Sequence, residues 1–106
     1  MPSINFHGSN LSNVNFQDTN LNRADFGKAI LLNTIFTNSD LSDAYFGYAN
    51  LEGANFRRAN LRGTNFIYAN LRGANFCGVD LSSTQITSEQ LATVKKNWLT
   101  IMPKKK

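Results

Sequence analysis

The sequence predicts an all-β solenoid, a chain wound as a polygonal coil around an apolar axis, and three observations predict it. A large apolar residue recurs every five positions from Phe6 to Leu81, with Phe and Leu in strict alternation. A small or β-branched residue stands two positions before each of these centres. Outward positions twenty residues apart hold opposite charges or paired aromatic rings. The five-residue unit is therefore the element from which the fold is built.

The repeat runs through sixteen consecutive centres without a slip. The centres are Phe6, Leu11, Phe16, Leu21, Phe26, Leu31, Phe36, Leu41, Phe46, Leu51, Phe56, Leu61, Phe66, Leu71, Phe76 and Leu81. In an α-helix, five residues rotate the side chain by a net angle of about 140°, so the centres would spiral around all sides. In a straight strand, an odd step moves the side chain to the opposite face. If all centres are buried together, the chain must bend within every unit.

The alternation of Phe and Leu indicates how many units make one turn. Like residues stack on like only if the number of units is even, and two units leave no interior room for a Phe ring. Four units stack residue n on residue n + 20, about 4.8 Å away as in a sheet. Favourable cross-strand neighbours then result. They are Arg23 with Asp43, Glu52 with Arg72, and Tyr48 with Tyr68.

The units "ANLEG", "ANFRR", "ANLRG" and "TNFIY" resemble the A(D/N)LXX units of the pentapeptide-repeat protein family. The resemblance covers about residues 4–83. It implies a right-handed quadrilateral β-helix of about four coils, with centres at 6–21, 26–41, 46–61 and 66–81, here named coils one to four. It also implies that the centre and the residue two before it point inward, and that the other three residues point outward.

The segment after the repeats is predicted to be an α-helix over 88–101 that folds over coil four as a cap. Gln90 stands three residues after Thr87, as in a capping box. An apolar helical face is formed by Leu91, Val94, Trp98 and Ile101. The alternative is a basic amphipathic helix that binds a membrane or a partner. The expected domains are the β-helix at 1–86, the capping helix at 87–102 and a basic tail at 103–106.

The net charge of +4 is confined to the end of the chain. Residues 1–86 hold six basic and six acidic groups, whereas residues 87–106 hold five lysines and one acid. We interpret the terminal lysines as a solvated end. No apolar run reaches the roughly 18 residues of a membrane span. The N-terminal stretch lacks a signal peptide, and the single Cys77 requires no oxidising compartment. We expect a cytoplasmic protein that does not bind membranes.

The sequence offers no catalytic chemistry. His7 and Cys77 lie in different coils, so they cannot form a nucleophile pair. No cluster of ligands has metal-binding spacing, and the glycines form no phosphate loop. We therefore expect a protein that is not an enzyme, with no catalytic residues, metal or cofactor.

A candidate interaction surface comes from the outward residues that are apolar, aromatic or basic. Apolar side chains replace the usual Asn or Asp at Ile30 and Ile35, and Tyr45 makes a similar replacement. These departures are either an interface or tolerated drift, and they put the local hydrogen bonding in doubt. The candidate residues are Ile30, Leu32, Ile35, Tyr45, Tyr48, Tyr68, Arg57, Arg58, Arg62 and Arg72.

The function expected is that of a rigid scaffold for protein–protein interaction, with an unidentified protein partner. Because residues 1–3 cannot cover coil one, a homodimer through that coil is a further expectation. Some family members bind DNA gyrase by imitating DNA, which makes a gyrase or topoisomerase modulator one alternative. The neutral body weakens it, because DNA mimicry needs a negative surface. Weak nucleic-acid binding through the four arginines and the lysine tail is another alternative, although these arginines lie on different faces.

Overall fold

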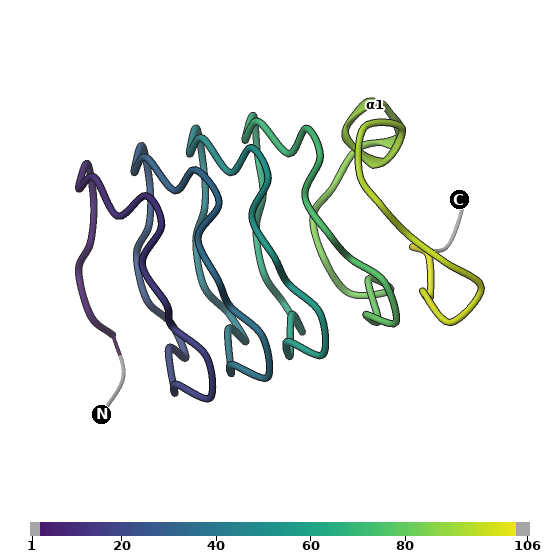
Figure 1. Ribbon diagram of the computed structural model, residues 1–106, viewed down its shortest axis with the longest axis horizontal. Helices are drawn as coiled ribbons and strands as arrows, with labels where there is room; N and C mark the ends of the chain where they lie inside the picture. The colour runs from purple at the N-terminus through teal and green to yellow at the C-terminus, as the bar shows by residue number, and fades with distance from the viewer. Residues whose placement is uncertain (1–2, 104–106) are drawn as a thin grey trace.

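The computed structural model describes residues 3–103 and shows a solenoid of stacked turns (Figure 1). Parallel bridges join residues twenty apart, for example Asp25 with Tyr45 and Tyr45 with Asn65. Main-chain hydrogen bonds flank each of these bridges, as from the Tyr45 amide to the Ala24 carbonyl at 3.0 Å and from the Phe26 amide to the Tyr45 carbonyl at 2.7 Å. The predicted stacking of residue n on residue n + 20 is confirmed. Each bridge is one residue long, so the coil has no long flat strand.

Each five-residue unit contains a tight turn that bends the chain. The amide three residues after the centre donates to the carbonyl of the centre, as from Ala49 to Phe46 at 3.1 Å. In the units centred from Phe6 to Phe76, the second residue after the centre has a positive φ, which is 61° at Tyr48 and 74° at Gly53. A positive φ at the second central residue alone is typical of a type II turn. The bend that the periodicity predicts in every unit is therefore a β-turn.

The Asn or Asp before each centre holds this turn in place. The Oδ1 atom of Asn55 accepts a hydrogen bond from the Arg57 amide at 3.0 Å, and Asp25 serves Gly27 in the same way. Ile30, Ile35 and Tyr45 have no such acceptor, so the doubt about hydrogen bonding at these units is justified. At Ile30, the amide of Leu32 instead donates to the Ser12 hydroxyl at 3.1 Å.

The axis of the solenoid is filled by two ladders of Phe rings that touch each other. Within a ladder the rings stack, with centroids of Phe26 and Phe46 4.8 Å apart and nearly parallel. Between ladders they meet edge to face, as Phe46 and Phe56 do at 5.8 Å and 89°. Both geometries are favourable for aromatic pairs. Leu centres and small residues complete this core, and the buried Thr64 hydroxyl donates to the Leu41 carbonyl at 2.9 Å.

The helix predicted over 88–101 is wrong beyond its first turn. Helix α1 spans Ser88–Leu91, and its capping box at Thr87 is present as expected. The chain then continues the ladders of the solenoid, because Lys95 bridges to Asn75 and Ile101 to Asp80. Pairing in this way satisfies main-chain groups at the edge of coil four, which a helix with internally bonded main chain cannot do. Within residues 3–103, no helix is long and apolar enough to cross a membrane.

The side chains of this segment are also placed differently from the prediction. Leu91 and Val94 join the core, but Trp98, expected to cover coil four, is 89% exposed. Ile101 is exposed as well, so the expected apolar helical face does not exist. Of the predicted basic tail at 103–106, the three lysines lie outside the described residues.

Truncating a ring in the middle of a ladder tests the core. We expect Phe56→Ala to lower the free energy of unfolding by about 3–5 kcal/mol, because it leaves a cavity between stacked rings. Phe6→Ala is the matched control, since Phe6 is only partly buried at the open end and should cost less than about 2 kcal/mol. Urea unfolding monitored by circular dichroism measures both. Equal losses for the two variants would contradict a continuous packed axis.

The side chain that holds each turn can be tested with a second pair of variants. Asn55→Ala removes the acceptor for the Arg57 amide and should lower the free energy of unfolding by about 1 kcal/mol. Asn55→Asp keeps an oxygen at the same place, as Asp25 and Asp40 do naturally. We expect it to stay within about 0.5 kcal/mol of the parent. If both variants unfold alike in urea, the hydrogen bond is not what selects Asn or Asp there.

Candidate interaction surfaces

One side of the solenoid carries exposed aromatic and aliphatic residues from the units centred on Phe46 and Phe66. The rings of Tyr48 and Tyr68 pack with centroids 5.2 Å apart, as the twenty-residue stacking predicts. They remain 56% and 72% exposed, and the neighbouring Ile67 is exposed too. We call Tyr48, Ile67 and Tyr68 the tyrosine face. Ile67 is not among the residues predicted from the sequence, although its outward position beside Tyr68 could have identified it.

Tyr45 lies close to this face but has a different role. A Cβ atom added at Gly27 would come within 2.8 Å of the Tyr45 ring, and one added at Gly47 would meet the ring and its hydroxyl. The ring therefore covers the main chain of two buried glycines. This packing explains why an aromatic residue replaces Asn at position 45. Tyr45 is a structural cover with a partly exposed edge.

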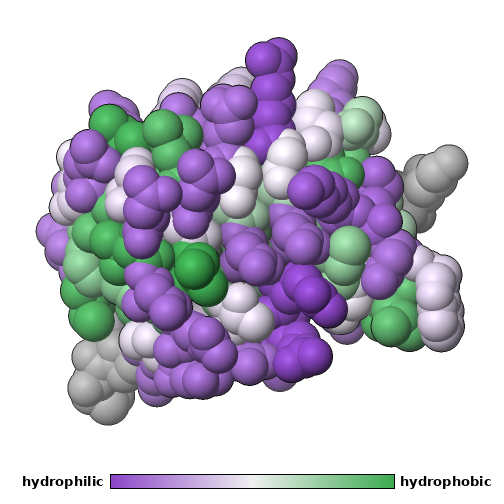
Figure 2. Space-filling view, in the orientation of Figure 1, coloured by the Kyte–Doolittle hydropathy of each residue, from purple (hydrophilic) through white to green (hydrophobic). Residues whose placement is uncertain are grey.

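The apolar patch predicted around coil two is smaller than expected. Ile30 is exposed, but Leu32 and Ile35 are half-buried. Ile30 and Leu32 flank the Leu31 centre, whereas Ile35 belongs to the next unit around the turn. Figure 2 shows hydrophobic surface over the N-terminal half of the molecule and again at the C-terminal end, with mostly hydrophilic surface between them.

The four candidate arginines are exposed and lie on three sides of the solenoid. Arg57 and Arg58 follow the Phe56 centre, while Arg62 and Arg72 follow Leu centres on two other sides. The stacked partners Glu52 and Arg72 are neighbours by register. Within residues 3–103, however, no salt bridge joins any of the predicted charge pairs. The structure therefore does not bring these side chains together into one basic groove.

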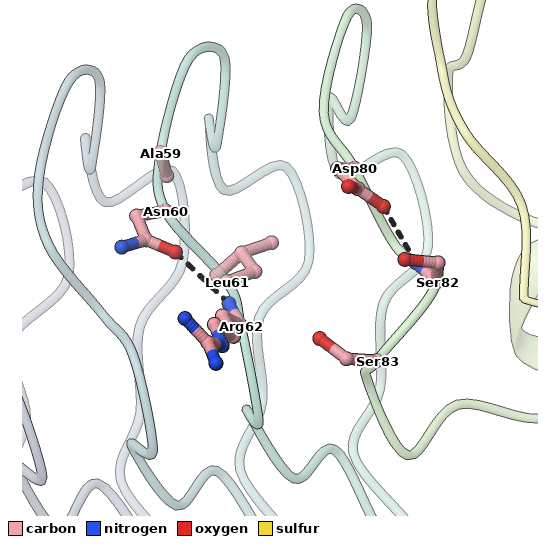
Figure 3. A pocket seen from close by; sticks show the side chains of 7 residues that line it. All are labelled: Ala59, Asn60, Leu61, Arg62, Asp80, Ser82 and Ser83. Carbon is pink, nitrogen blue, oxygen red and sulfur yellow. Dashed lines mark hydrogen bonds between the residues drawn. The ribbon is translucent and has the colours of Figure 1, made fainter.

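A slit opens between coils three and four, in the unit that contains Arg62 (Figure 3). The regular ladder would bridge Asn60 to Asp80, but this bridge is missing from the part of the chain that the structure describes. The slit encloses about 340 Å³ and is lined by Arg62, Asp80 and Ser83 among others. The Ser83 hydroxyl accepts from the Gly63 amide at 3.2 Å in place of a main-chain carbonyl.

Asp80 is the titratable group in this slit whose pKa is shifted from its usual value. The hydroxyl and the main-chain amide of Ser82 hold the pKa of Asp80 below its usual value, and the amide lies 2.9 Å from Oδ1. A carboxyl with a depressed pKa favours folding above its usual pKa, and this contribution disappears as the pH falls through the folded value. The group is exposed and lacks a second carboxylate beside it. In residues 3–103, no group of three or more His, Cys, Asp or Glu side chains could hold a metal ion.

The period of five and the turn in every unit decide the family. A family model of pentapeptide repeats matches the chain in eight copies, over residues 3–38, 19–58 and 44–82. The chain belongs to the pentapeptide-repeat family. No match is found among the curated proteins.

Solved pentapeptide-repeat structures share this β-helix fold. The pentapeptide-repeat protein Rfr23 from the cyanobacterium Cyanothece 51142 is 25% identical, with a TM-score of 0.79, and the match covers 96% of this chain and 83% of Rfr23. QnrB1, a plasmid-mediated fluoroquinolone resistance protein, is 24% identical, with a TM-score of 0.61 over 94% of this chain and 54% of QnrB1. HetL, which is involved in heterocyst differentiation regulation in Nostoc sp. strain PCC 7120, is 24% identical, with a TM-score of 0.54 over 93% of this chain and 47% of HetL. The chain spans about half the length of the last two proteins, whose likeness shows the fold alone.

The contact between the two exposed tyrosines can be measured as a coupling energy. We expect a double-mutant cycle of Tyr48→Ala and Tyr68→Ala to give about 0.5–1 kcal/mol, because the rings stack across one ladder step. Urea unfolding of the parent, the two single variants and the double variant supplies the four free energies. A cycle of Tyr48→Ala with Arg57→Ala, which lies on another side, is the control and should couple by less than about 0.3 kcal/mol. Strict additivity of the tyrosine pair would contradict the contact.

Proposed function

We propose that this pentapeptide-repeat protein is a non-catalytic scaffold that binds a protein partner through the tyrosine face. The observation that carries the proposal is the stacked, solvent-exposed pair Tyr48 and Tyr68 beside exposed Ile67. Tyrosines are enriched among the residues that dominate protein–protein binding energies. Their rings are held by each other before binding, so little side-chain entropy remains to be lost. The unidentified protein partner would meet this surface in the cytoplasm.

The supporting geometry is the rigidity of the body behind the face. The ring centroids of Phe46 and Phe66 lie 5.2 Å apart in the stack directly beneath it.

We also propose the finer features of the fold expected from the sequence. The solenoid is right-handed and quadrilateral, has about four coils, and is capped at its C-terminal end by residues 87–102. A homodimer through coil one is proposed on the partly buried Phe6, Leu11 and Phe16 at its open end.

DNA mimicry is not proposed, because the charges of the solenoid do not suit it. Residues 1–86 are balanced between acidic and basic groups, and Arg57 and Arg58 add exposed positive charge. A surface that imitates DNA needs a strong negative potential. The likeness to QnrB1 is a likeness of fold. Nucleic-acid binding by the arginines is likewise set aside, because these residues lie on separate sides.

A cross-linking capture experiment tests the proposed scaffold function. The bait is the full chain, and the test variant combines Tyr48→Ser with Tyr68→Ser. Ile30→Asn is the matched control, because it removes an exposed apolar side chain that lies outside the tyrosine face, in the adjoining unit centred on Leu31. We expect a partner that the parent and Ile30→Asn capture equally and that the tyrosine variant loses at least about tenfold. Circular dichroism must show that all three proteins are folded.

The same experiment can contradict the proposal in two ways. A partner lost by Ile30→Asn and kept by the tyrosine variant would assign the working surface to coil two. A capture profile identical for all three proteins would remove both surfaces. Inhibition of gyrase supercoiling by the parent protein, unchanged in the tyrosine variant, would restore the mimicry alternative.

A further inference from the structure

The C-terminal end of the solenoid combines exposed apolar side chains with the net charge of the chain. Trp98, Leu99, Ile101 and Met102 are all exposed, and together with Lys95 we call them the end patch. Trp98 is 89% exposed, which makes it the most exposed large apolar side chain of the described residues. In Figure 1 this segment forms the last loop, opposite the N-terminus, and Figure 2 shows hydrophobic surface at the same end.

An open apolar groove lies beside the end patch. It has a volume of about 570 Å³ and lies between α1 and the end of the described chain. Ile86, Leu91 and Met102 line it, together with the polar Ser88 and Lys96. The Lys96 ammonium group donates to the Leu91 carbonyl at 2.8 Å, which places a cation against the last turn of α1. Because most of the lining is apolar, a hydrocarbon chain can fill the groove.

The charge of this end distinguishes between the surfaces that could cover it. Residues 87–106 carry five lysines and the single acid Glu89, which accounts for the whole formal charge of the chain. A second copy docked end to end would bring Lys95 and Lys96 of both copies together, and like charges oppose such a contact. A nucleic acid would satisfy the lysines and could stack on Trp98, but it would leave Leu99, Ile101 and Met102 without apolar partners. An anionic bilayer surface satisfies both kinds of side chain.

We propose that the end patch docks the protein on the surface of an anionic lipid membrane. Trp98 and Leu99 insert at the level of the headgroups, where tryptophan is favoured. Lys95 and Lys96, which are both exposed, contact the acidic headgroups. The axis of the solenoid then points away from the membrane surface. The tyrosine face, which lies on the side of the solenoid, stays accessible to a partner. This proposal goes beyond the scaffold function and does not depend on it.

This inference replaces the expectation that no membrane is bound. That expectation rested on the lack of an apolar run long enough to span a membrane. It also rested on a helix at 88–101 whose apolar face, including Trp98, was expected to cover coil four. The structure covers coil four with Leu91, Val94 and the paired main chain instead. The Trp98 side chain is consequently left free of the core.

Vesicle binding by the full chain tests the proposal, and Trp98 is the only tryptophan, so it reports directly. The probes are vesicles of phosphatidylcholine with about 30 mol% phosphatidylglycerol and vesicles of phosphatidylcholine alone. We expect a blue shift of the Trp98 emission and co-sedimentation with the anionic vesicles, both weakened by salt. Neutral vesicles should bind at least about tenfold more weakly, because the lysines lose their counter-charges.

Variants separate the apolar contribution from the basic one. Trp98→Ala with Leu99→Ser should lower co-sedimentation at least about tenfold, since it removes the inserted side chains. Lys95→Gln should lower it about fivefold. Tyr48→Ala with Tyr68→Ala is the matched control, because it removes two exposed rings from the side of the solenoid and should leave vesicle binding unchanged.

Four results would overturn the inference. One is the absence of both blue shift and co-sedimentation with anionic vesicles. Another is equal vesicle binding by the parent and the Trp98 and Leu99 variant. A third is a dimer, seen without lipid in sedimentation velocity, that this variant abolishes, because the patch would then be a contact between copies. The fourth is binding of single-stranded DNA that is tighter than vesicle binding and lost in the same variant.

Discussion

The structure depends on one constraint, the β-turn that each pentapeptide makes directly after its centre. In the units centred from Phe6 to Phe76, the turn places a residue with positive φ at the second position after the centre. That conformation costs a residue with a side chain about 1–2 kcal/mol. Glycine occupies it at Gly53 and Gly63, but Arg58 and Tyr68 do so as well. This cost is offset because the β-turn directs every centre to the axis and aligns the amides and carbonyls for hydrogen bonds with the coils above and below. Without it, neither the Phe ladders nor the main-chain ladders would exist.

The sequence predicts the body of the solenoid well because it is periodic. Each unit repeats the same sequence pattern and the same turn, so a departure from the pattern at one position does not shift the register predicted for the other units. The stacking of Tyr48 on Tyr68 followed from the twenty-residue offset alone, and it is present at 5.2 Å. Phe and Leu alternation likewise predicted ring ladders such as Phe36 on Phe56, with centroids 5.1 Å apart. The replacement of Asn by Tyr at position 45 is visible in the sequence. The packing of the Tyr45 ring over Gly27 and Gly47 is seen only in the structure.

The segment after Ile86 could not be predicted because two local patterns compete there. Its apolar residues have helical spacing, and Thr87 starts a helix with a complete capping box. The edge of coil four, however, presents unpaired main-chain groups to the same residues. Lys95 donates to the Ala74 carbonyl and accepts from the Phe76 amide, each at 2.8 Å, and these long-range bonds leave no sign in a helical pattern. The tertiary edge therefore limits α1 to four residues. The slit at Asp80, where a predicted bridge is absent, has the same non-local character.

The periodicity of the chain also determines which parts of its surface can recognise a particular partner. A surface built from one repeated unit offers the same spacing everywhere, so recognition depends on positions at which the repeat is interrupted. On the side of the solenoid, that interruption is Tyr48, Ile67 and Tyr68, which stand where most units have short polar residues. At its end, the interruption is the loop that carries Trp98. The two surfaces differ in chemistry, since the first is uncharged and pre-stacked and the second is apolar and surrounded by lysines. They also lie on different parts of a rigid body, so each can be occupied without closing the other.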